Sequence, residues 1–150
     1  MKSTDLVIRP YDAAADLTRL SAIWLSASRI AHPFIGEQQL QEQQVLVETL
    51  YLPTAETWVA SMTGEAVGFI SLLDQFIGGL FIEPCRQGEG IGRALVQHAL
   101  ARKGDLSLDV YTQNRQAFGF YLKLGFQEVS RRSADDQGLP FENARLLLKA

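Results

Sequence analysis

The sequence predicts an α/β domain built on a mixed, mostly antiparallel and twisted sheet that is flanked by helices. Its length of 150 residues is typical of one domain, so we expect a single domain over residues 1–150. Its composition, with 47% hydrophobic and 21% charged residues, is typical of a globular chain. Strand patterns and helix patterns are interspersed, and a helix between two strands allows some parallel pairing.

The first third of the chain predicts one strand and two helices. Residues 6–10, LVIRP, are typical of a short strand. Residues 13–30 carry apolar side chains at helical spacing, namely Leu17, Leu20, Ile23, Trp24 and Ala27. Pro33 disfavours helical backbone at the preceding residue, so we expect a break there. A second helix is then expected over residues 37–52, with Pro53 ending it.

The middle of the chain predicts three strands and a helix. Residues 56–74 carry two strand patterns on either side of Thr63-Gly64, which is typical of a hairpin turn. A third strand pattern occupies residues 76–82. Helical spacing follows over residues 91–102, and Gly104 is a typical stop signal for that helix.

The last third predicts a strand, a helix and a final pair of strands. Residues 106–112 alternate like a strand. Asn114 can cap a helix over residues 115–124, and Gly125 ends it. The two final strands are expected on either side of the loop ADDQGLP, within residues 126–133 and 141–149.

The segment PCRQGEGIGRAL, residues 84–95, places three glycines where a helix must start. Glycine disfavours helices, so its repeated use here requires another reason. The first N–H groups of a helix have no internal partner and carry partial positive charge. Without a Cβ, Gly88, Gly90 and Gly92 let an anion such as a phosphate approach these groups. Arg86 and Arg93 flank the turn and can add charge-assisted bonds.

The spacing of these glycines excludes two other phosphate motifs. A Rossmann fingerprint needs glycine at its first, third and sixth positions, but the sixth position is Arg93 or Leu95 here. A P-loop ends in Gly-Lys-Ser/Thr, which the sequence lacks. By itself, the segment is equally consistent with a flexible turn that permits close packing of a helix against a strand.

Two segments together resemble a known family. Gln87-x-x-Gly90-x-Gly92 resembles the acetyl-CoA signature of the GCN5-related N-acetyltransferases, the GNAT family. NRQAFGFYLKLGF, residues 114–126, resembles a later motif of that family. The resemblance covers residues 66–126 well. The segments AHPFI and DDQGLPF resemble a bacterial subset that includes small peptide- or amine-directed enzymes.

The resemblance implies a GNAT-like domain that transfers an acetyl group from acetyl-CoA directly to a primary amine of a peptide, a protein or a small molecule. It implies that the pantetheine arm pairs with the strand Leu80, Phe81 and Ile82. The implied pyrophosphate site is the turn that consists of Gln87, Gly88, Glu89, Gly90, Ile91 and Gly92. Asn114 either binds the cofactor or only caps its helix.

Tyr121 matches the family's general acid, which protonates the leaving thiolate. It also shares a helical face with Ala117, Phe120 and Leu124, which by itself indicates core packing. A phenol with a pKa near 10 stays protonated at neutral pH and can donate to sulfur.

The sequence is less specific about the general base and about the residues that contact the acceptor amine. Many relatives carry a carboxylate on the strand before the glycine turn, but Ile77-Gly78-Gly79 has none. Glu83, Asp109, Tyr111 and His32 are the candidate bases. The position of His32 beside Pro33-Phe34 favours a structural loop residue somewhat over a base. The residues expected on the acceptor side are His32, Phe34 and Asp109.

The remaining expectations concern partners and location. A net charge of −3 without a basic run disfavours a nucleic-acid partner, and no apolar run is long enough to span a membrane. The single Cys85 excludes an internal disulfide, so we expect a cytoplasmic protein, and no residue cluster has metal-ligand spacing. A non-catalytic acyl-CoA-binding sensor is the alternative function. The sequence leaves monomer and homodimer open.

Overall fold

The structure, a computed structural model, describes residues 6–150 and contains a seven-stranded sheet in the order β1-β2-β3-β4-β5-β7-β6. The strands are β1 Leu6–Pro10, β2 Glu56–Met62, β3 Glu65–Leu73, β4 Phe76–Ile82, β5 Leu106–Tyr111, β6 Gln127–Arg132 and β7 Asn143–Leu148. Neighbouring strands are antiparallel except β4 and β5, which are parallel. The predicted mixed, mostly antiparallel sheet is therefore confirmed.

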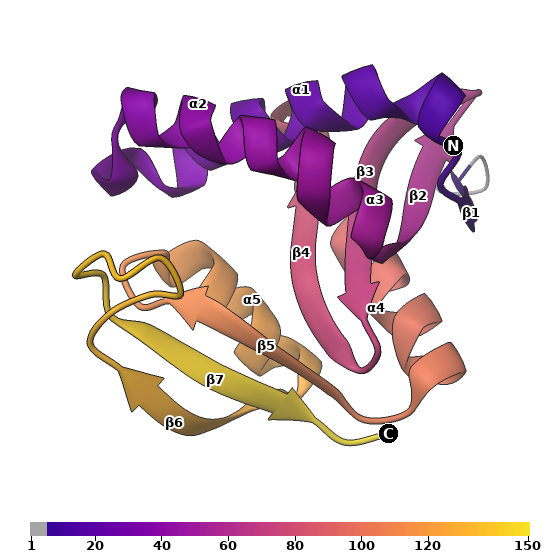
Figure 1. Cartoon of the computed structure of the whole chain (residues 1–150). Coiled ribbons are helices and arrows are strands. Elements are labelled where there is room, and N and C mark those ends of the chain that lie inside the picture. Colours follow the sequence, from indigo (N-terminus) through magenta and orange to yellow (C-terminus); the bar gives the residue numbers. More distant parts are fainter. Residues whose placement is uncertain (1–5) are drawn as a thin grey trace.

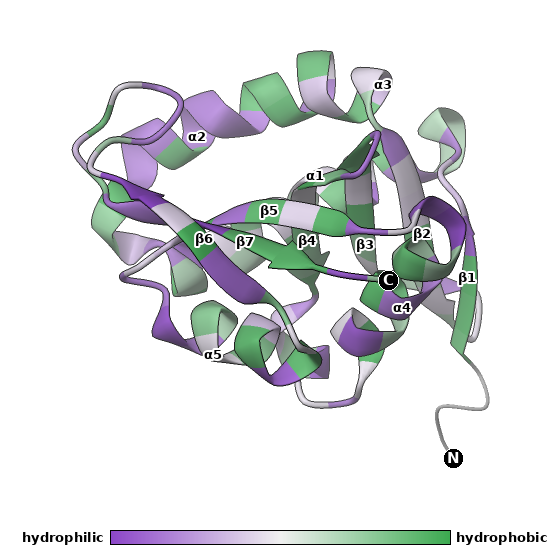
Figure 2. Ribbon diagram, turned by 90° about the horizontal axis from the view of Figure 1, so that it is seen from below, coloured by the Kyte–Doolittle hydropathy of each residue, from purple (hydrophilic) through white to green (hydrophobic). Residues whose placement is uncertain are grey.

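Helices cover both faces of this sheet. They are α1 Ala13–Ala31, α2 Glu37–Leu46, α3 Leu52–Thr54, α4 Ile91–Lys103 and α5 Arg115–Leu124, with the short turns η2 Pro33–Ile35 and η4 Pro84–Arg86 and the π-helical η3 Val47–Tyr51. Figure 2 shows α1 to α3 on one face and α4 and α5 on the other. One core, around Leu20 and Phe69, lies under α1, and a second, around Leu95 and Leu146, lies under α4 and α5.

Local turn chemistry follows the sequence closely. Thr63 and Gly64 both have positive φ, 51° and 84°, as a two-residue hairpin between β2 and β3 requires. The Asn114 side chain accepts from the Ala117 N–H at 3.2 Å, which confirms it as the cap of α5. Gly125, with φ 107°, ends that helix.

The predicted end of the second helix at Pro53 is wrong. The chain leaves α2 through the π-helical turn η3 and enters α3, which contains Pro53 and runs to Thr54. Helical backbone runs without a break from Glu37 to Thr54, and Pro53 lies in its last turn, directly after the π-helical segment. The helix therefore ends just after the proline and not before it.

β4 and β5 pair only over their first residues. The paired residues are Phe76 with Ser107 and Ile77 with Leu108. Against β3, Gly79 pairs with Ser71 and Ile77 with Leu72, so Gly78 is an extra residue on β4. Such a bulge bends and twists its strand. Figure 1 shows β4 and β5 diverging beyond it, and we call this gap between the two strands the β4–β5 opening.

Candidate active site

β4 presents unpaired backbone groups to the β4–β5 opening. The Glu83 N–H donates to the Val67 carbonyl on β3 at 2.8 Å. Because backbone groups alternate in direction along a strand, those of Phe81 also face β3, where Phe81 pairs with Phe69. Those of Leu80 and Ile82 face the opposite way, beyond the last β4–β5 pair. An extended ligand can therefore pair with Leu80 and Ile82 as an added strand.

The turn between β4 and α4 presents free amides. Within residues 6–150, the N–H groups from Gly88 to Arg93 have no hydrogen-bond acceptor, and the first helical bond runs from the Ala94 N–H to the Gly90 carbonyl at 3.1 Å. Gly90 is the N-cap of α4 and supplies no side-chain cap. These amides lie at the positive end of a helix, so they are placed where an anion such as a phosphate can bind.

The three glycines of this turn have different roles. Gly88 and Gly90 have φ values of 85° and 83°, which glycine adopts without strain, and no atom lies within 4 Å of a Cβ placed on either. A Cβ on Gly92 would lie 3.1 Å from Cζ of Phe120 on α5. The first two glycines therefore keep open the space beside the free amides, whereas Gly92 permits α4 and α5 to pack closely.

Side chains around the turn connect it to α5. The Gln87 side-chain oxygen accepts from Nε2 of Gln116 at 3.4 Å. Arg86 forms an ion pair with Glu89 at 3.6 Å, and the exposed Arg93 has no ion pair within the described chain. The charge that remains available beside the amides is therefore that of Arg93.

Tyr121 lies on α5 and is only 8% exposed. Its ring lies 5.2 Å from that of Phe120 and 5.4 Å from that of Phe126, in the core against which Leu80 and Ile82 also pack. Burial raises the pKa of the Tyr121 phenol above its usual value, so the hydroxyl stays protonated at neutral pH. The Tyr121 hydroxyl has no hydrogen-bond partner within residues 6–150, and it keeps some contact with solvent. Tyr121 is thus both a core residue and a hydrogen-bond donor without a partner.

Asn114 uses both ends of its side-chain amide. Its oxygen caps α5, and its nitrogen lies 3.2 Å from Nε2 of His32, just after α1. An amide nitrogen only donates, so Nε2 accepts and the proton of the neutral ring is on Nδ1. Burial lowers the pKa of His32 to about 4, which agrees with a neutral ring. Of the two predicted roles for Asn114, capping is confirmed, and its amide nitrogen bonds a residue of the predicted acceptor side.

His32, Phe34, Tyr111 and Phe141 form an aromatic cluster at the end of β5. The ring centroids of His32 and Tyr111 are 5.1 Å apart, and those of Phe34 and Phe141 are 5.2 Å apart. Phe34 and Tyr111 are separated by 5.4 Å in an edge-to-face arrangement. The cluster thus brings together η2, β5 and the loop between β6 and β7.

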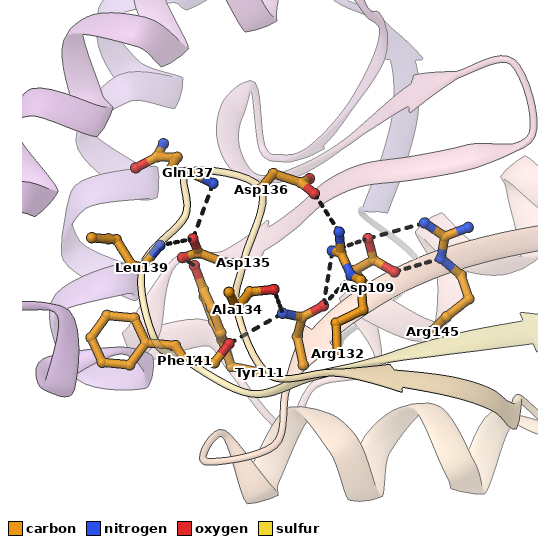
Figure 3. Close-up of polar contacts among 11 residues, drawn as sticks. Asp109, Tyr111, Arg132, Ala134, Asp135, Asp136, Gln137, Leu139, Phe141 and Arg145 are labelled. Carbon is orange, nitrogen blue, oxygen red and sulfur yellow. Dashed lines mark hydrogen bonds and ion pairs between the residues drawn. The ribbon is translucent and has the colours of Figure 1, made fainter.

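Each candidate base already has a polar partner. Asp109 binds Arg132 and Arg145, as Figure 3 shows, and Glu83 lies 3.5 Å from Arg19. Tyr111 donates to Asp135 at 2.8 Å, and burial together with this bond raises the pKa of the Tyr111 phenol. His32 accepts from Asn114. Their sequence positions near the site do not reveal these pairings.

Sequence reasoning missed two residues that hold the loop between β6 and β7. Asp135 accepts from the N–H groups of Gln137 at 3.0 Å and Leu139 at 2.9 Å. Nδ2 of Asn143 donates to the carbonyls of Ala134 at 3.0 Å and Phe141 at 3.2 Å (Figure 3). The signal was available, since Asp followed by Asp-Gln-Gly is typical of an Asx turn.

The part of the chain that the structure describes lacks two kinds of feature. No helix there combines the length and apolar character that crossing a bilayer requires. No group of three or more His, Cys, Asp or Glu side chains in that part is placed to hold a metal ion.

Comparison with known proteins shows the family. Residues 53–128 match the family described as acetyltransferase (GNAT) domain. The chain is 41% identical over 123 residues to peptidyl-lysine N-acetyltransferase YjaB of Escherichia coli K12. The alignment covers 81% of this chain and 83% of YjaB. It is 33% identical over 127 residues to peptidyl-lysine N-acetyltransferase YiaC of the same strain, in an alignment that covers 84% of this chain and 87% of YiaC.

Solved structures agree with this assignment. The solution structure of apo YjaB from Escherichia coli has a TM-score of 0.87 at 37% identity and covers 97% of this chain and 99% of that one. The structure of yncA from Salmonella typhimurium with its cofactor acetyl-CoA has a TM-score of 0.69, covering 97% and 94% of the two chains. At 18% identity, that second likeness is one of fold alone. The chain belongs to the GNAT acetyltransferase family and is an N-acetyltransferase.

Proposed function

We propose that this protein transfers the acetyl group of acetyl-CoA to the side-chain amine of lysine residues in peptides or proteins. One observation carries the proposal: the unpaired backbone of Leu80 and Ile82 lies one short turn before the free amides from Gly88 to Arg93. Acyl-CoA has an amide-containing arm that fits the first feature and a pyrophosphate that fits the second. The names of the relatives YjaB and YiaC support lysine as the acceptor.

The proposed reaction makes one bond and breaks one. The neutral lysine nitrogen bonds to the acetyl carbonyl carbon, and the C–S bond breaks with its electron pair remaining on sulfur. Tyr121 donates a hydrogen bond to that sulfur. Because burial raises the pKa of Tyr121, complete transfer of its proton to a thiolate, whose usual pKa is about 8.5, is uphill. Tyr121 therefore acts mainly through a bond that strengthens as charge develops. The proton lost by the amine passes through water and completes the thiol.

The acceptor must lose a proton before it attacks. A lysine amine with its usual pKa is neutral in only about one molecule in 2,500 at pH 7. Since Glu83, Asp109, Tyr111 and His32 all have polar partners, we propose that this first proton goes to solvent in the β4–β5 opening.

The predicted acceptor residues remain part of the proposal. His32 and Phe34 belong to the aromatic cluster at the end of β5, and Asp109 shares a strand face with Tyr111 of that cluster. The whole chain, residues 1–150, is proposed to act as one domain in the cytoplasm, where the exposed thiol of Cys85 stays reduced.

An amine panel tests the proposal. The protein is incubated with acetyl-CoA and an N-terminally blocked peptide that contains one lysine, and thiol release and the peptide mass are followed. The matched controls are the same peptide with arginine in place of lysine and an unblocked peptide without lysine. We expect acetylation of the lysine peptide alone. Acetylation of the free α-amine alone would overturn the lysine assignment, and CoA binding without thiol release for any amine would support the sensor alternative.

A further inference from the structure

The sheet has two halves, β1 to β4 and β5 to β7, which meet between β4 and β5. Few backbone pairs join these two halves at the candidate site. Beyond Ile77 and Leu108, no backbone pair joins β4 to β5 in the described chain. β5 leads directly into α5, which carries Tyr121, whereas α1 packs against β3 and β4. The position of Tyr121 relative to β4 therefore depends on side-chain contacts: the packing of α5 against α4 and the shared core, and the contacts at the open end.

One group of these contacts lies at the open end, where it connects the end of α1 and η2 to β5 and α5. Asn114 at the start of α5 bonds His32, which directly follows α1, at 3.2 Å. The rings of His32 and Phe34 contact Tyr111, and Phe34 also contacts Phe141. We call these five residues the clasp. A weaker contact beside it, from Gln43 of α2 to Gln137 at 3.2 Å, joins the same two halves.

We propose that His32 is a positioning residue for acetyl transfer: by accepting a hydrogen bond from Asn114, it holds the start of α5 against the end of α1 and so places Tyr121 beside β4. This inference rests on the proposed function. The bond has a defined direction, because the oxygen of Asn114 is already committed to the Ala117 N–H. His32 must therefore remain an acceptor at Nε2 for the clasp to close.

Two other roles for this cluster fit the geometry less well. The rings of Phe34, Tyr111 and Phe141 have centroids 5.2 to 6.2 Å apart, so they contact one another and leave no space for an ammonium group between them. A general base needs a free lone pair, but Nε2 of His32 is occupied by Asn114. A positioning role uses the bond that is present.

Matched substitutions separate this bond from the stability of the fold. His32→Leu keeps bulk but removes the acceptor, whereas His32→Gln retains an oxygen that can accept from Asn114. Asn114→Ser keeps a good helix cap but no longer reaches His32. Gln113→Ser makes a similar change at the exposed neighbouring residue and serves as the control.

The measurements are kcat and KM for the lysine peptide, CoA affinity by calorimetry, and the melting temperature of each variant. We expect His32→Leu and Asn114→Ser each to lower kcat by roughly 10- to 100-fold, because misplacement by about 1 Å can cost that much. We expect CoA affinity to stay within about twofold, because Leu80, Ile82 and the amides from Gly88 to Arg93, to which CoA is proposed to bind, are unchanged. His32→Gln should recover most of the kcat that His32→Leu loses, and Gln113→Ser should remain close to wild type. The double variant His32→Leu/Asn114→Ser should be no slower than the worse single variant, since both remove one bond.

Several outcomes would overturn the inference. They are near-normal kcat in folded His32→Leu or Asn114→Ser, a multiplicative loss in the double variant, or an equal loss in His32→Gln. If His32→Leu does not fold, Asn114→Ser decides the question, because it keeps the cap. Failure of the wild-type protein to acetylate any lysine peptide would instead refute the proposed function.

Discussion

Replacing Tyr121 by phenylalanine separates its two roles in the structure. The substitution removes one oxygen and keeps the ring against Phe120 and Phe126. Because the hydroxyl has no hydrogen-bond partner within residues 6–150, no bond is lost there, and the free energy of unfolding should change by less than about 1 kcal/mol. Loss of a positioned donor should lower kcat by roughly 100-fold or more, which corresponds to about 2.7 kcal/mol of transition-state stabilisation.

The assay compares two tyrosines in the same chain. Turnover of the lysine peptide, CoA affinity and thermal melting are measured for Tyr121→Phe and for Tyr51→Phe, which makes the same chemical change at an exposed position on η3. We expect the loss of kcat only in Tyr121→Phe, with CoA affinity and melting unchanged in both. Near-normal turnover of a folded Tyr121→Phe protein would refute the role of this hydroxyl and leave Tyr121 as a packing residue.

Three further predictions concern CoA affinity, the stabilisation of the fold by CoA, and the dependence of stability on pH. Gly90→Ala places a Cβ in the open space beside the free amides, so it should weaken CoA binding at least about tenfold, measured by calorimetry. The control Gly64→Ala lies in the hairpin between β2 and β3 at φ 84°, close to the 83° of Gly90. It should cost similar backbone strain of about 1 kcal/mol and leave CoA affinity unchanged. CoA at a hundredfold excess over Kd should raise the free energy of unfolding by about 2.7 kcal/mol in thermal melts. Equal shifts from ATP or NAD, which lack the pantetheine arm, would contradict pairing with Leu80 and Ile82. The pKa of His32 is about 4 when folded and near its usual 6.5 when unfolded, so the unfolded state binds more protons between these values and stability falls as pH drops from 6.5 to 4. Denaturant titrations should show that His32→Gln loses less stability over this window, by up to about 3 kcal/mol, and parallel curves would show that burial of His32 has no such effect.

Local features of the chain are predictable because they depend on short-range geometry. The hairpin at Thr63-Gly64 requires positive φ at both residues, and the cap at Asn114 requires an acceptor three residues before the Ala117 N–H. Helix and strand patterns follow from side-chain periods of 3.6 and 2, which the sequence displays directly. The glycine turn and Tyr121 could be selected as candidate site residues on the same basis, with the family resemblance supplying their predicted roles.

Features that depend on distant residues required the tertiary structure. The bulge at Gly78 is recognised from the register of β4 against β3, and it is this bulge that turns β4 away from β5. The place of β7 between β5 and β6 follows from strand pairing, which hydrophobic patterning along one strand does not specify. A Gly-Gly pair within a strand pattern indicates a bulge, but not the strand from which it diverges.

The sequence by itself therefore predicted the order of the strands and most of the helices, the glycine turn as a candidate anion site and the family resemblance, while the tertiary structure decided which polar groups remain free. Gly92 belongs to the same motif as Gly88 and Gly90, yet only the position of Phe120 shows that it serves packing. His32 and Asn114 are 82 residues apart, and their bond exists because the fold brings the ends of α1 and β5 together. Hydrogen-bond partners are matters of distance in space, and spacing along the chain carries that information only within a turn or a helix.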